Sequence, residues 1–305
     1  MLKHKVSRET AKLVLRQLIN EGLIISRQGK GSFVVPQARI NDQWGMIIPF
    51  YSSNIEQLIH FLEFEAQKRG KQLTYFLHYN NPEEEMKLVS KMIFEGYEAV
   101  IVVPNYDESH TAEFYRKLIH GHTSVILVDN TMSGSYFKYV VQSYDLGVKR
   151  AVEYIVENTT GNLVMIKSDT WKGRNLLGEL MEQTLRNTME LEFPDRNFFI
   201  VSNLKDLNRL FFIENKLEGI LTTSDTDAIR ILGRMKKWDI KVPEQARLVS
   251  YGNTELTLYN EPAITVVDCK YEAMAEKTAE LIAMGKRVGS YEQHIIQPEL
   301  IVRDT

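Results

Sequence analysis

Short apolar segments alternate with amphipathic segments along most of this chain. From residue 44 onward, runs of about five apolar residues, such as 99–103 and 124–128, are typical of strands that are buried on both faces. The segments between them repeat apolar residues every three or four positions, which predicts helices that pack through one face. Strands and helices in alternation indicate parallel sheets covered by helices on both sides.

The same pattern fixes the expected elements. Strands are predicted at residues 44–49, 71–78, 99–103, 124–128, 163–166, 198–201, 219–222 and 246–251. Helices are predicted at residues 54–69, 82–95, 111–119, 145–157, 172–187, 206–214 and 227–237. These eight strands exceed the usual size of one open sheet. We therefore expect an α/β fold with two doubly wound parallel-sheet lobes, in which a ligand binds beyond the carboxyl ends of the strands.

The first 35 residues have a different pattern. Ser7 can cap a helix, and Arg8, Lys12 and Arg16 form a basic stripe beside its apolar face. The helix should end near residues 20–22, and two short strands at 23–25 and 32–35 should be joined by a basic, glycine-containing hairpin. A basic helix followed by a basic hairpin can bind DNA, with the helix in the major groove and the hairpin along phosphates or the minor groove. A surface amphipathic helix followed by an ordinary hairpin is the structural alternative.

Three blocks of this segment resemble the winged helix-turn-helix of the GntR family of bacterial repressors. They are Val6-Ser7-Arg8-x-Thr10, Leu18-x-x-Glu21-Gly22-Leu23-Ile24 and Arg27-Gln28-Gly29-Lys30-Gly31-x-Phe33-Val34. The resemblance implies the following contacts with DNA: Ser7, Arg8, Thr10, Lys12, Arg16, Arg27, Gln28, Gly29 and Lys30. GntR-type modules have two further helices upstream, so the resemblance covers only a partial winged helix-turn-helix. A piece of this size rarely folds alone, and we expect a reading frame that starts upstream or a chain that is a fragment.

Ordered motifs from residue 44 to residue 305 resemble the effector domain of the LacI/GalR family, which is related to periplasmic sugar-binding proteins. They are Asp145-Leu146-Gly147-x-x-x-Ala151-x-x-Tyr154-Ile155, Asp225-x-x-Ala228-x-x-x-Leu232-Gly233, Ile240-Lys241-Val242-Pro243-Glu244, Leu248-Val249-Ser250-Tyr251-Gly252-Asn253, Pro262-Ala263-Ile264-Thr265-Val266-Val267 and Pro298-Glu299-Leu300-Ile301-Val302-Arg303. A GntR-type head on a LacI-type body resembles arabinose repressors of the AraR type. The resemblance implies the two-lobed, type I periplasmic-binding-protein-like fold.

This resemblance divides the chain into three parts. Residues 1–36 are the partial DNA-binding domain, and the polar, proline-containing residues 37–43 are a linker. Residues 44–305 are the effector-binding domain. Its N-lobe should contain residues 44–141 and 269–292, and its C-lobe residues 142–268 and 293–305.

Residues of the first lobe are expected to bind a sugar, because loops at strand ends line the effector cleft in LacI-type domains. The candidates are Phe50, Tyr51, Ser52, Asn54, Asn105 and Asp129. An aromatic face packs against ring C–H groups, while hydroxyl, amide and carboxylate groups bond ring hydroxyls. Simple loop packing by Phe50 and Tyr51, and turn formation by Asn105 and Asp129, stay open as alternatives.

The second lobe departs from the LacI pattern. The arginine that the family places three residues before a glycine corresponds to Asn175, with Arg174 just ahead of it. The aspartate of the Gly-Tyr-Asp motif falls on Gly252, which leaves Asn253 as a substitute. Trp171 could stack on a sugar ring or pack in its loop. Asp225 could bond sugar hydroxyls, and the alternative is that Asp225 or Thr226 caps the helix that follows. These departures imply an effector other than the family's commonest pentose or hexose in its usual pose.

Composition narrows the functional classes. The 305 residues are 44% hydrophobic and 25% charged, with a single cysteine, Cys269, and no apolar run of membrane-spanning length. No signal peptide is visible at the start, so we expect a cytoplasmic protein. The first 36 residues carry a net charge of +5, which leaves −8 for the remainder of a chain whose total is −3. Only the basic head should therefore seek the phosphates of DNA.

Two rival classes are weaker. The histidines are scattered, and the sequence has no nucleophile turn, phosphate loop or metal-ligand spacing, so we expect no catalytic residues, no metal and no cofactor. A transport solute-binding protein would not carry a DNA-binding head. The favoured hypothesis is a sugar-responsive transcriptional repressor that binds operator DNA as a homodimer. The alternative is a carbohydrate sensor or solute-binding protein that does not bind DNA because its head is incomplete.

Overall fold

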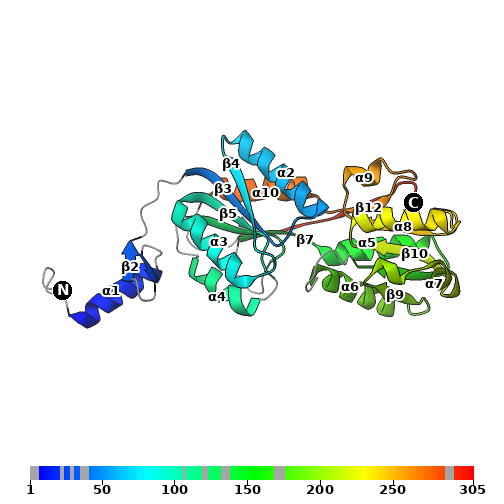
Figure 1. The fold of residues 1–305 in the computed structure, drawn as a ribbon, viewed down its shortest axis with the longest axis horizontal. Helices are drawn as coiled ribbons and strands as arrows, with labels where there is room; N and C mark the ends of the chain where they lie inside the picture. The colour runs from blue at the N-terminus through cyan, green and yellow to red at the C-terminus, as the bar shows by residue number, and fades with distance from the viewer. Residues whose placement is uncertain are drawn as a thin grey trace. The chain divides into compact units, whose positions relative to one another are not determined.

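The computed structural model describes residues 7–20, 24–27, 31–34, 41–105, 108–118, 123–131, 138–167, 176–285 and 292–305. Contacts divide the chain into two units. Unit 1 contains Met1–Tyr51, Ile59–Val141 and Met274–His294, and unit 2 contains Ser52–Leu58, Gln142–Ala273 and Ile295–Thr305. Each unit holds one six-stranded sheet with helices on both faces (Figure 1). The predicted α/β fold with two parallel-sheet lobes is therefore confirmed.

The sheet of unit 1 has the order β13-β7-β6-β5-β3-β4. Its strands are β3 (Asn41–Ile48), β4 (Gln72–Leu77), β5 (Tyr97–Val102), β6 (Ser124–Asp129), β7 (Lys138–Gln142) and β13 (Gln293–Ile296). Neighbouring strands from β4 to β7 are parallel. The helices are α2 (Ser53–Lys68), α3 (Pro82–Glu95), α4 (Glu108–Leu118) and α10 (Tyr271–Ala283). Apolar side chains of α3 and α4 pack on one face of the sheet, and α2 and α10 cover the other (Figure 1).

The sheet of unit 2 has the order β14-β12-β11-β10-β8-β9. Its strands are β8 (Asn162–Ile166), β9 (Phe198–Val201), β10 (Leu217–Thr222), β11 (Arg247–Tyr251), β12 (Thr265–Asp268) and β14 (Glu299–Ile301), of which only β14 is antiparallel to its neighbour. The helices are α5 (Tyr144–Glu157), α6 (Leu176–Glu192), α7 (Arg209–Glu214), α8 (Asp225–Lys237) and α9 (Glu255–Leu258). Cys269, the only cysteine of the sequence, follows β12 and is 1% exposed.

Both sheets have the same switch in strand order. In unit 1 the chain begins at β3, moves outward to β4, and then returns to the other side of β3 with β5. In unit 2 the strands β8, β9 and β10 repeat this arrangement. Helices on either side of such a switch diverge, which leaves a crevice beyond the carboxyl ends of the strands where ligands bind in doubly wound folds. The loops after β3, β5, β8 and β10 are therefore the places to look for a site.

Some boundaries differ from the predictions. The helix expected at 172–187 continues to Glu192, because Thr188 and Met189 extend its buried face. The helix expected at 206–214 is divided into a 3₁₀ turn (η1, Leu204–Asp206) and α7. Asn208 causes the division, since its side chain accepts the N–H of Phe211 and starts a new helix. Residues 172–175 lie outside the described residues.

The amino-terminal elements are α1 (Arg8–Asn20) and the antiparallel pair β1 (Ile24–Arg27) and β2 (Gly31–Val34). Ser7 caps α1 as predicted, because its hydroxyl oxygen accepts the N–H of Thr10 at 3.0 Å. Leu13 and Val14 of α1 are 66% and 49% exposed. These elements agree with a helix and hairpin, and their assignment to a winged helix-turn-helix stays a prediction. Across the described part of the chain, no helix has the length and apolar character needed to cross a bilayer.

Candidate functional site

The ends of three strands in unit 1 lie in register at one edge of the sheet. The N–H of His78, after β4, donates to the carbonyl of Ile48 at 2.9 Å, and the N–H of Val103, after β5, donates to the carbonyl of Ile47 at 2.9 Å. The loops that carry the first-lobe candidates therefore start together at the carboxyl edge. Three of these candidates are Phe50, Tyr51 and Asn105, which follow β3 and β5.

The aromatic and polar candidates at this edge differ in exposure. Tyr51 is 49% exposed and its ring lies 6.4 Å from that of Tyr75, whereas Phe50 is half-buried. Asn105 and Asp129 are both buried, and Asp129 ends β6 with a φ of +62°. An accessible ring beside recessed polar groups is an arrangement that can bind a sugar. A positive φ at Asp129 also fits the alternative of turn formation.

A buried carboxylate lies directly behind Asn105. Glu85, in the first turn of α3, is fully buried and accepts two hydrogen bonds. One comes from the backbone N–H of Asn105 at 2.5 Å and the other from the hydroxyl of Tyr115, on α4, at 2.6 Å. Burial raises the pKa of Glu85 to about 7, although both hydrogen bonds oppose this shift.

His78 is the other buried ionisable group behind this edge. Its Nε2 lies 3.1 Å from the carbonyl oxygen of Val103, to which it donates, and 3.8 Å from Oε2 of Glu85, which is too far for a hydrogen bond. Burial lowers the pKa of His78 to about 4, so the ring is neutral at pH 7. His78 and Glu85 are thus close neighbours without being an ion pair.

Neither Glu85 nor His78 was predicted from the sequence as a member of this edge. Glu85 could not be distinguished from its neighbours Glu83 and Glu84, because acidic residues are common in the first turn of a helix. A usable signal was present, since Glu85 lies at helical spacing from the buried residues Leu88 and Met92. The pattern therefore placed a carboxylate on the core face of α3.

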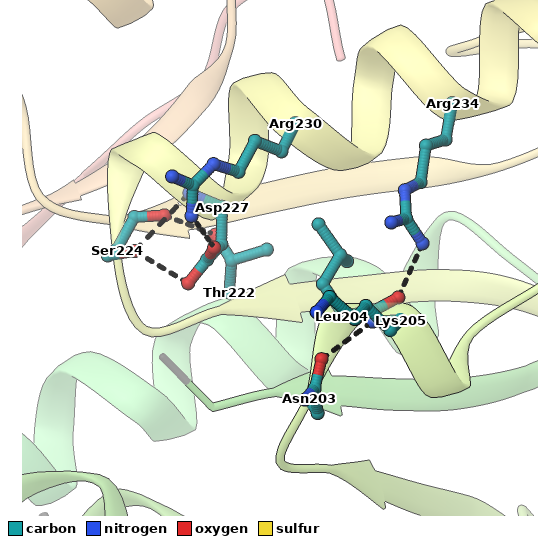
Figure 2. Close-up of polar contacts among 8 residues, drawn as sticks. All are labelled: Asn203, Leu204, Lys205, Thr222, Ser224, Asp227, Arg230 and Arg234. Carbon is teal, nitrogen blue, oxygen red and sulfur yellow. Dashed lines mark hydrogen bonds and ion pairs between the residues drawn. The ribbon is translucent and has the colours of Figure 1, made fainter. Parts of the chain in front are cut away.

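In unit 2, a different residue from the expected one caps α8. The hydroxyl oxygen of Ser224 accepts the N–H of Asp227 at 3.3 Å, and the hydroxyl donates to Oδ2 of Asp227 at 3.0 Å (Figure 2). Arg230 pairs with the same carboxylate at 3.3 Å. The alternative reading of Asp225 or Thr226 as the helix cap is therefore wrong, and Ser224 has that role.

Asp225 instead joins the ends of β10 and β11. It is 1% exposed, and its Oδ1 accepts the hydroxyl of Ser250 at 2.5 Å while its Oδ2 accepts the N–H of Thr254 at 2.8 Å. The hydroxyl of Thr222, at the end of β10, lies 3.3 Å from that of Ser250 and extends the network. Each carboxylate oxygen has a second lone pair that can accept a ligand hydroxyl.

Asn253 is held by a carboxy-terminal arginine. Its Oδ1 accepts Nη2 of Arg303 at 2.6 Å, and Nη1 of Arg303 donates to the hydroxyl of Thr257 and the carbonyl of Ile264, both at 3.0 Å. The amide oxygen of Asn253 therefore fixes the loop after β11. Its amide nitrogen is the group that could donate to a ligand.

The remaining effector candidates divide into two groups. At the start of α2, the hydroxyl oxygen of Ser52 accepts the N–H of Ile55 at 3.3 Å, whereas Oδ1 of Asn54 is buried without a hydrogen-bond partner among the described residues. Trp171, Arg174 and Asn175 lie outside the described residues. Lys167, which was not among the predicted candidates, follows β8 and pairs with Glu182 at 2.6 Å.

The candidates for DNA contact lie on α1 and the hairpin. Ser7, Arg8, Thr10, Lys12 and Arg16 are exposed. The backbone of Arg27 ends β1, and Gln28, Gly29 and Lys30 lie outside the described residues. Exposed cations spaced along one helix are able to contact phosphates.

Replacing Gly252 with alanine should disturb the unit 2 site. Gly252 has a φ of +141°, and a Cβ there would lie 2.8 Å and 2.9 Å from the two carboxylate oxygens of Asp225. We expect the free energy of unfolding to fall by about 2 kcal/mol, because the backbone becomes strained and Asp225 must move. Urea denaturation would measure the change.

The matched control is Gly233→Ala in α8, where a Cβ meets no atom within 4 Å. This variant should be neutral or more stable by about 0.5 kcal/mol. Equal stability of Gly252→Ala and Gly233→Ala would contradict the crowding at position 252.

Comparisons with known proteins agree with this architecture. Residues 173–305 match the family model described as a periplasmic binding protein-like domain. A structure of a periplasmic binding protein/LacI transcriptional regulator from Alkaliphilus metalliredigens, in complex with D-xylulofuranose, superposes with a TM-score of 0.69 over 87% of this chain and 99% of that one, at 16% identity. The fold is periplasmic-binding-protein-like. A structure of the transcription regulator CcpA of Lactococcus lactis shares it with a TM-score of 0.65, at 17% identity, over 86% of this chain and 98% of that one.

Sequence relatives of the chain are named as transcription regulators. The arabinose metabolism transcriptional repressor of Halalkalibacterium halodurans is 23% identical over 338 aligned positions, which cover 99% of this chain and 88% of that protein. The HTH-type transcriptional repressor PurR of Vibrio parahaemolyticus is 19% identical over 208 positions, covering 65% of this chain and 62% of that protein. The first of these matches includes the amino-terminal segment.

Proposed function

We propose that the protein is a sugar-responsive transcriptional repressor. The observation that carries this proposal is the pair of doubly wound units, each with polar side chains at the carboxyl edge beside its strand-order switch. The relatives support it, since a repressor named for arabinose metabolism matches 99% of this chain. The likeness to a structure in complex with D-xylulofuranose supports a carbohydrate as the effector.

The proposed effector contacts lie at the carboxyl edges of the units. In unit 1, Phe50 and Tyr51 would face a sugar ring, while Asn105 and Asp129 would bond sugar hydroxyl groups. In unit 2, Asp225 would bond sugar hydroxyl groups. The other proposed contacts are Ser52, Asn54, Trp171, Arg174, Asn175 and Asn253. Sugar binding would favour one arrangement of the effector domain and so alter the affinity for operator DNA.

The proposed DNA-binding part is the basic amino-terminal segment, residues 1–36, as a partial GntR-type winged helix-turn-helix. The predicted linker at 37–43 is too long at its carboxyl end, because Asn41 begins β3 and pairs in the unit 1 sheet. A linker at 37–40 would connect the segment to the effector domain, predicted at 44–305, in an AraR-like arrangement. The protein would act in the cytoplasm as a homodimer, because two half-sites of an operator are related by two-fold symmetry. The exposed stripe of Arg8, Lys12 and Arg16 supports contact with phosphates.

One observation favours a second candidate, a carbohydrate sensor that does not bind DNA. Val14, Leu15 and Ile19 on the apolar face of α1 are exposed, whereas a stable DNA-binding domain buries the apolar face of its recognition helix. In this candidate the effector domain binds sugar and the amino-terminal segment has no operator.

Two measurements test the proposal. A panel of pentoses, hexoses and ketoses should contain at least one that raises the melting temperature, because a ligand of the folded state stabilises it. Fluorescence anisotropy with palindromic DNA from upstream of sugar-utilisation genes should show salt-dependent binding that this sugar changes. Sugar binding without any DNA binding would favour the sensor, and the absence of both would reject the regulator and the sensor.

The double variant Arg8→Ala/Lys12→Ala should weaken DNA binding with little effect on sugar binding. Two lost phosphate contacts should lower the slope of log K against log salt by about 2. Anisotropy titrations at several salt concentrations measure this slope. Lys87→Ala removes an exposed cation from α3 and is the matched control. An unchanged slope in the double variant would reject α1 as the DNA-contacting helix.

A further inference from the structure

Three separate elements of unit 1 meet at the carboxylate of Glu85. The carboxylate belongs to α3, the hydroxyl that binds its Oε1 belongs to Tyr115 of α4, and the N–H that binds its Oε2 belongs to Asn105 in the loop after β5. Glu85 is 0% exposed and Tyr115 is 2% exposed. Among the described residues, the backbone donor to this carboxylate is therefore a residue whose side chain is a candidate for effector binding.

We propose that Glu85 is a positioning residue for the effector site, whose ionised carboxylate holds Asn105 in place and whose protonation weakens effector binding. This inference rests on the proposed function, because it assumes that the edge at Asn105 receives the sugar. It assigns a role to a residue that does not itself touch the ligand.

The ionised state fits its two partners better than the protonated state. A carboxylate offers only acceptors, and both the N–H of Asn105 and the hydroxyl of Tyr115 can donate to it. A protonated carboxyl carries a hydrogen that needs an acceptor of its own. The hydrogen bond from the Asn105 N–H to the neutral carboxyl is also weaker than the bond to the charged carboxylate. Protonation should therefore loosen the backbone at Asn105.

The surroundings place this change near neutral pH. Burial raises the pKa of Glu85 to about 7. Among the described residues, the titratable groups that face it are His78, from the loop after β4, and Tyr115, from α4. His78 is neutral at this pH because burial lowers its pKa to about 4, and burial with the Glu85 charge raises the pKa of Tyr115 well above its ordinary value. Glu85 is thus the group in the cluster that titrates between pH 6 and 8.

The first test needs no ligand. In full-length protein labelled with ¹⁵N-asparagine, the backbone amide signal of Asn105, assigned by its loss in Asn105→Gln, should shift with an inflection near pH 7. The inflection should vanish in Glu85→Gln and persist in Glu83→Gln, which removes an exposed charge from the same helical turn. Tyr115→Phe removes one bond to the charged form, so it should move the inflection to higher pH. An Asn105 signal that does not titrate in the wild type would overturn the inference.

The second test uses a sugar that raised the melting temperature in the panel. If only the ionised form is competent to bind, the Kd measured by calorimetry should be about tenfold weaker at pH 6 than at pH 8. Glu85→Gln should bind weakly at both pH values, and Glu83→Gln should follow the wild type. A purely structural role for Glu85 predicts a wild-type Kd that is the same at both pH values.

The outcomes separate this inference from the proposed function. If no sugar binds while the Asn105 signal titrates, the proposed function fails and the coupling of Glu85 to Asn105 stands. If a sugar binds with the same pH dependence in the wild type and in Glu85→Gln, the function stands and the positioning role of Glu85 is overturned.

Discussion

Replacing Glu85 with glutamine is expected to make the stability of unit 1 rise with pH, and replacing His78 with glutamine is expected to make it fall. In the wild type, burial raises the pKa of Glu85 to about 7 and lowers that of His78 to about 4. A raised pKa means that the folded state binds a proton more tightly than the unfolded state does. The free energy of unfolding therefore falls as the pH rises from 4.5 to 7. A lowered pKa has the opposite effect, so the free energy of unfolding increases as the pH rises from 4 to 6.5. The two effects nearly cancel.

Each variant removes one of these two opposing effects of pH on stability. Between pH 5 and 6.5, the unfolding free energy of Glu85→Gln should rise by about 1.4 kcal/mol per pH unit relative to the wild type. That of His78→Gln should fall by a similar amount. His78 keeps its low pKa in the first variant, because the cause is burial and not the charge of Glu85.

Urea denaturation at several pH values would measure these slopes. Trp44 is buried in β3 and reports unit 1 once Trp171 and Trp238 are replaced by phenylalanine. Glu83→Gln is the control, since the removed carboxylate is exposed and its slope should match the wild type. Parallel slopes in wild type, Glu85→Gln and His78→Gln would show that burial shifts the pKa of neither group.

Adding one methyl group at Gly147 should destabilise unit 2. A Cβ on this residue of α5 would lie 2.4 Å from the hydroxyl oxygen of Tyr251 and 2.9 Å from two of its ring carbons. Tyr251 is held in place, because its ring stacks on Tyr144 with centroids 5.8 Å apart and its hydroxyl donates to Oε1 of Gln142 at 3.2 Å. We expect Gly147→Ala to lower the free energy of unfolding by about 3 kcal/mol, despite the better helix propensity of alanine.

A double-mutant cycle with Tyr251→Phe tests the cause. Removing the hydroxyl takes away the shortest contact, so the cost of Gly147→Ala should be smaller in the Tyr251→Phe background. Gly233→Ala again serves as the control for alanine in an open position of a helix. If the two substitutions are additive, the loss of stability does not arise at Tyr251.

The sequence predicted those elements whose limits are set locally. The helix at 82–95 was correct at both ends, because Asn81 accepts the N–H groups of Glu83 and Glu84, Pro82 starts the first turn, and Gly96 takes a φ of +79° after the last. Strand β9 was also correct at both ends. By contrast, the strands β7, β12, β13 and β14 and the helices α9 and α10 were not among the predicted elements. Three of these strands, β12, β13 and β14, are only three or four residues long, and β14 pairs with a strand more than 30 residues away in the sequence.

The candidate site could be predicted in part for the same reason. Residues that directly follow apolar strands, such as Asn105 and Asp225, could be placed at a carboxyl edge from the sequence alone. The burial of Glu85 depends on α4 and the loop after β5, and the bond between Asn253 and Arg303 spans 50 residues. Such contacts form only when the whole unit folds, so local patterns do not contain them.

The buried cysteine makes the chain convenient for distance measurements. Cys269 is the only thiol in the sequence and is 1% exposed, so a maleimide dye should react slowly with it. Cysteines introduced as Lys87→Cys in unit 1 and Lys236→Cys in unit 2 lie at exposed positions and should react first. Energy transfer between the two dyes would then report the separation of the units with and without sugar, with no need to remove a native thiol.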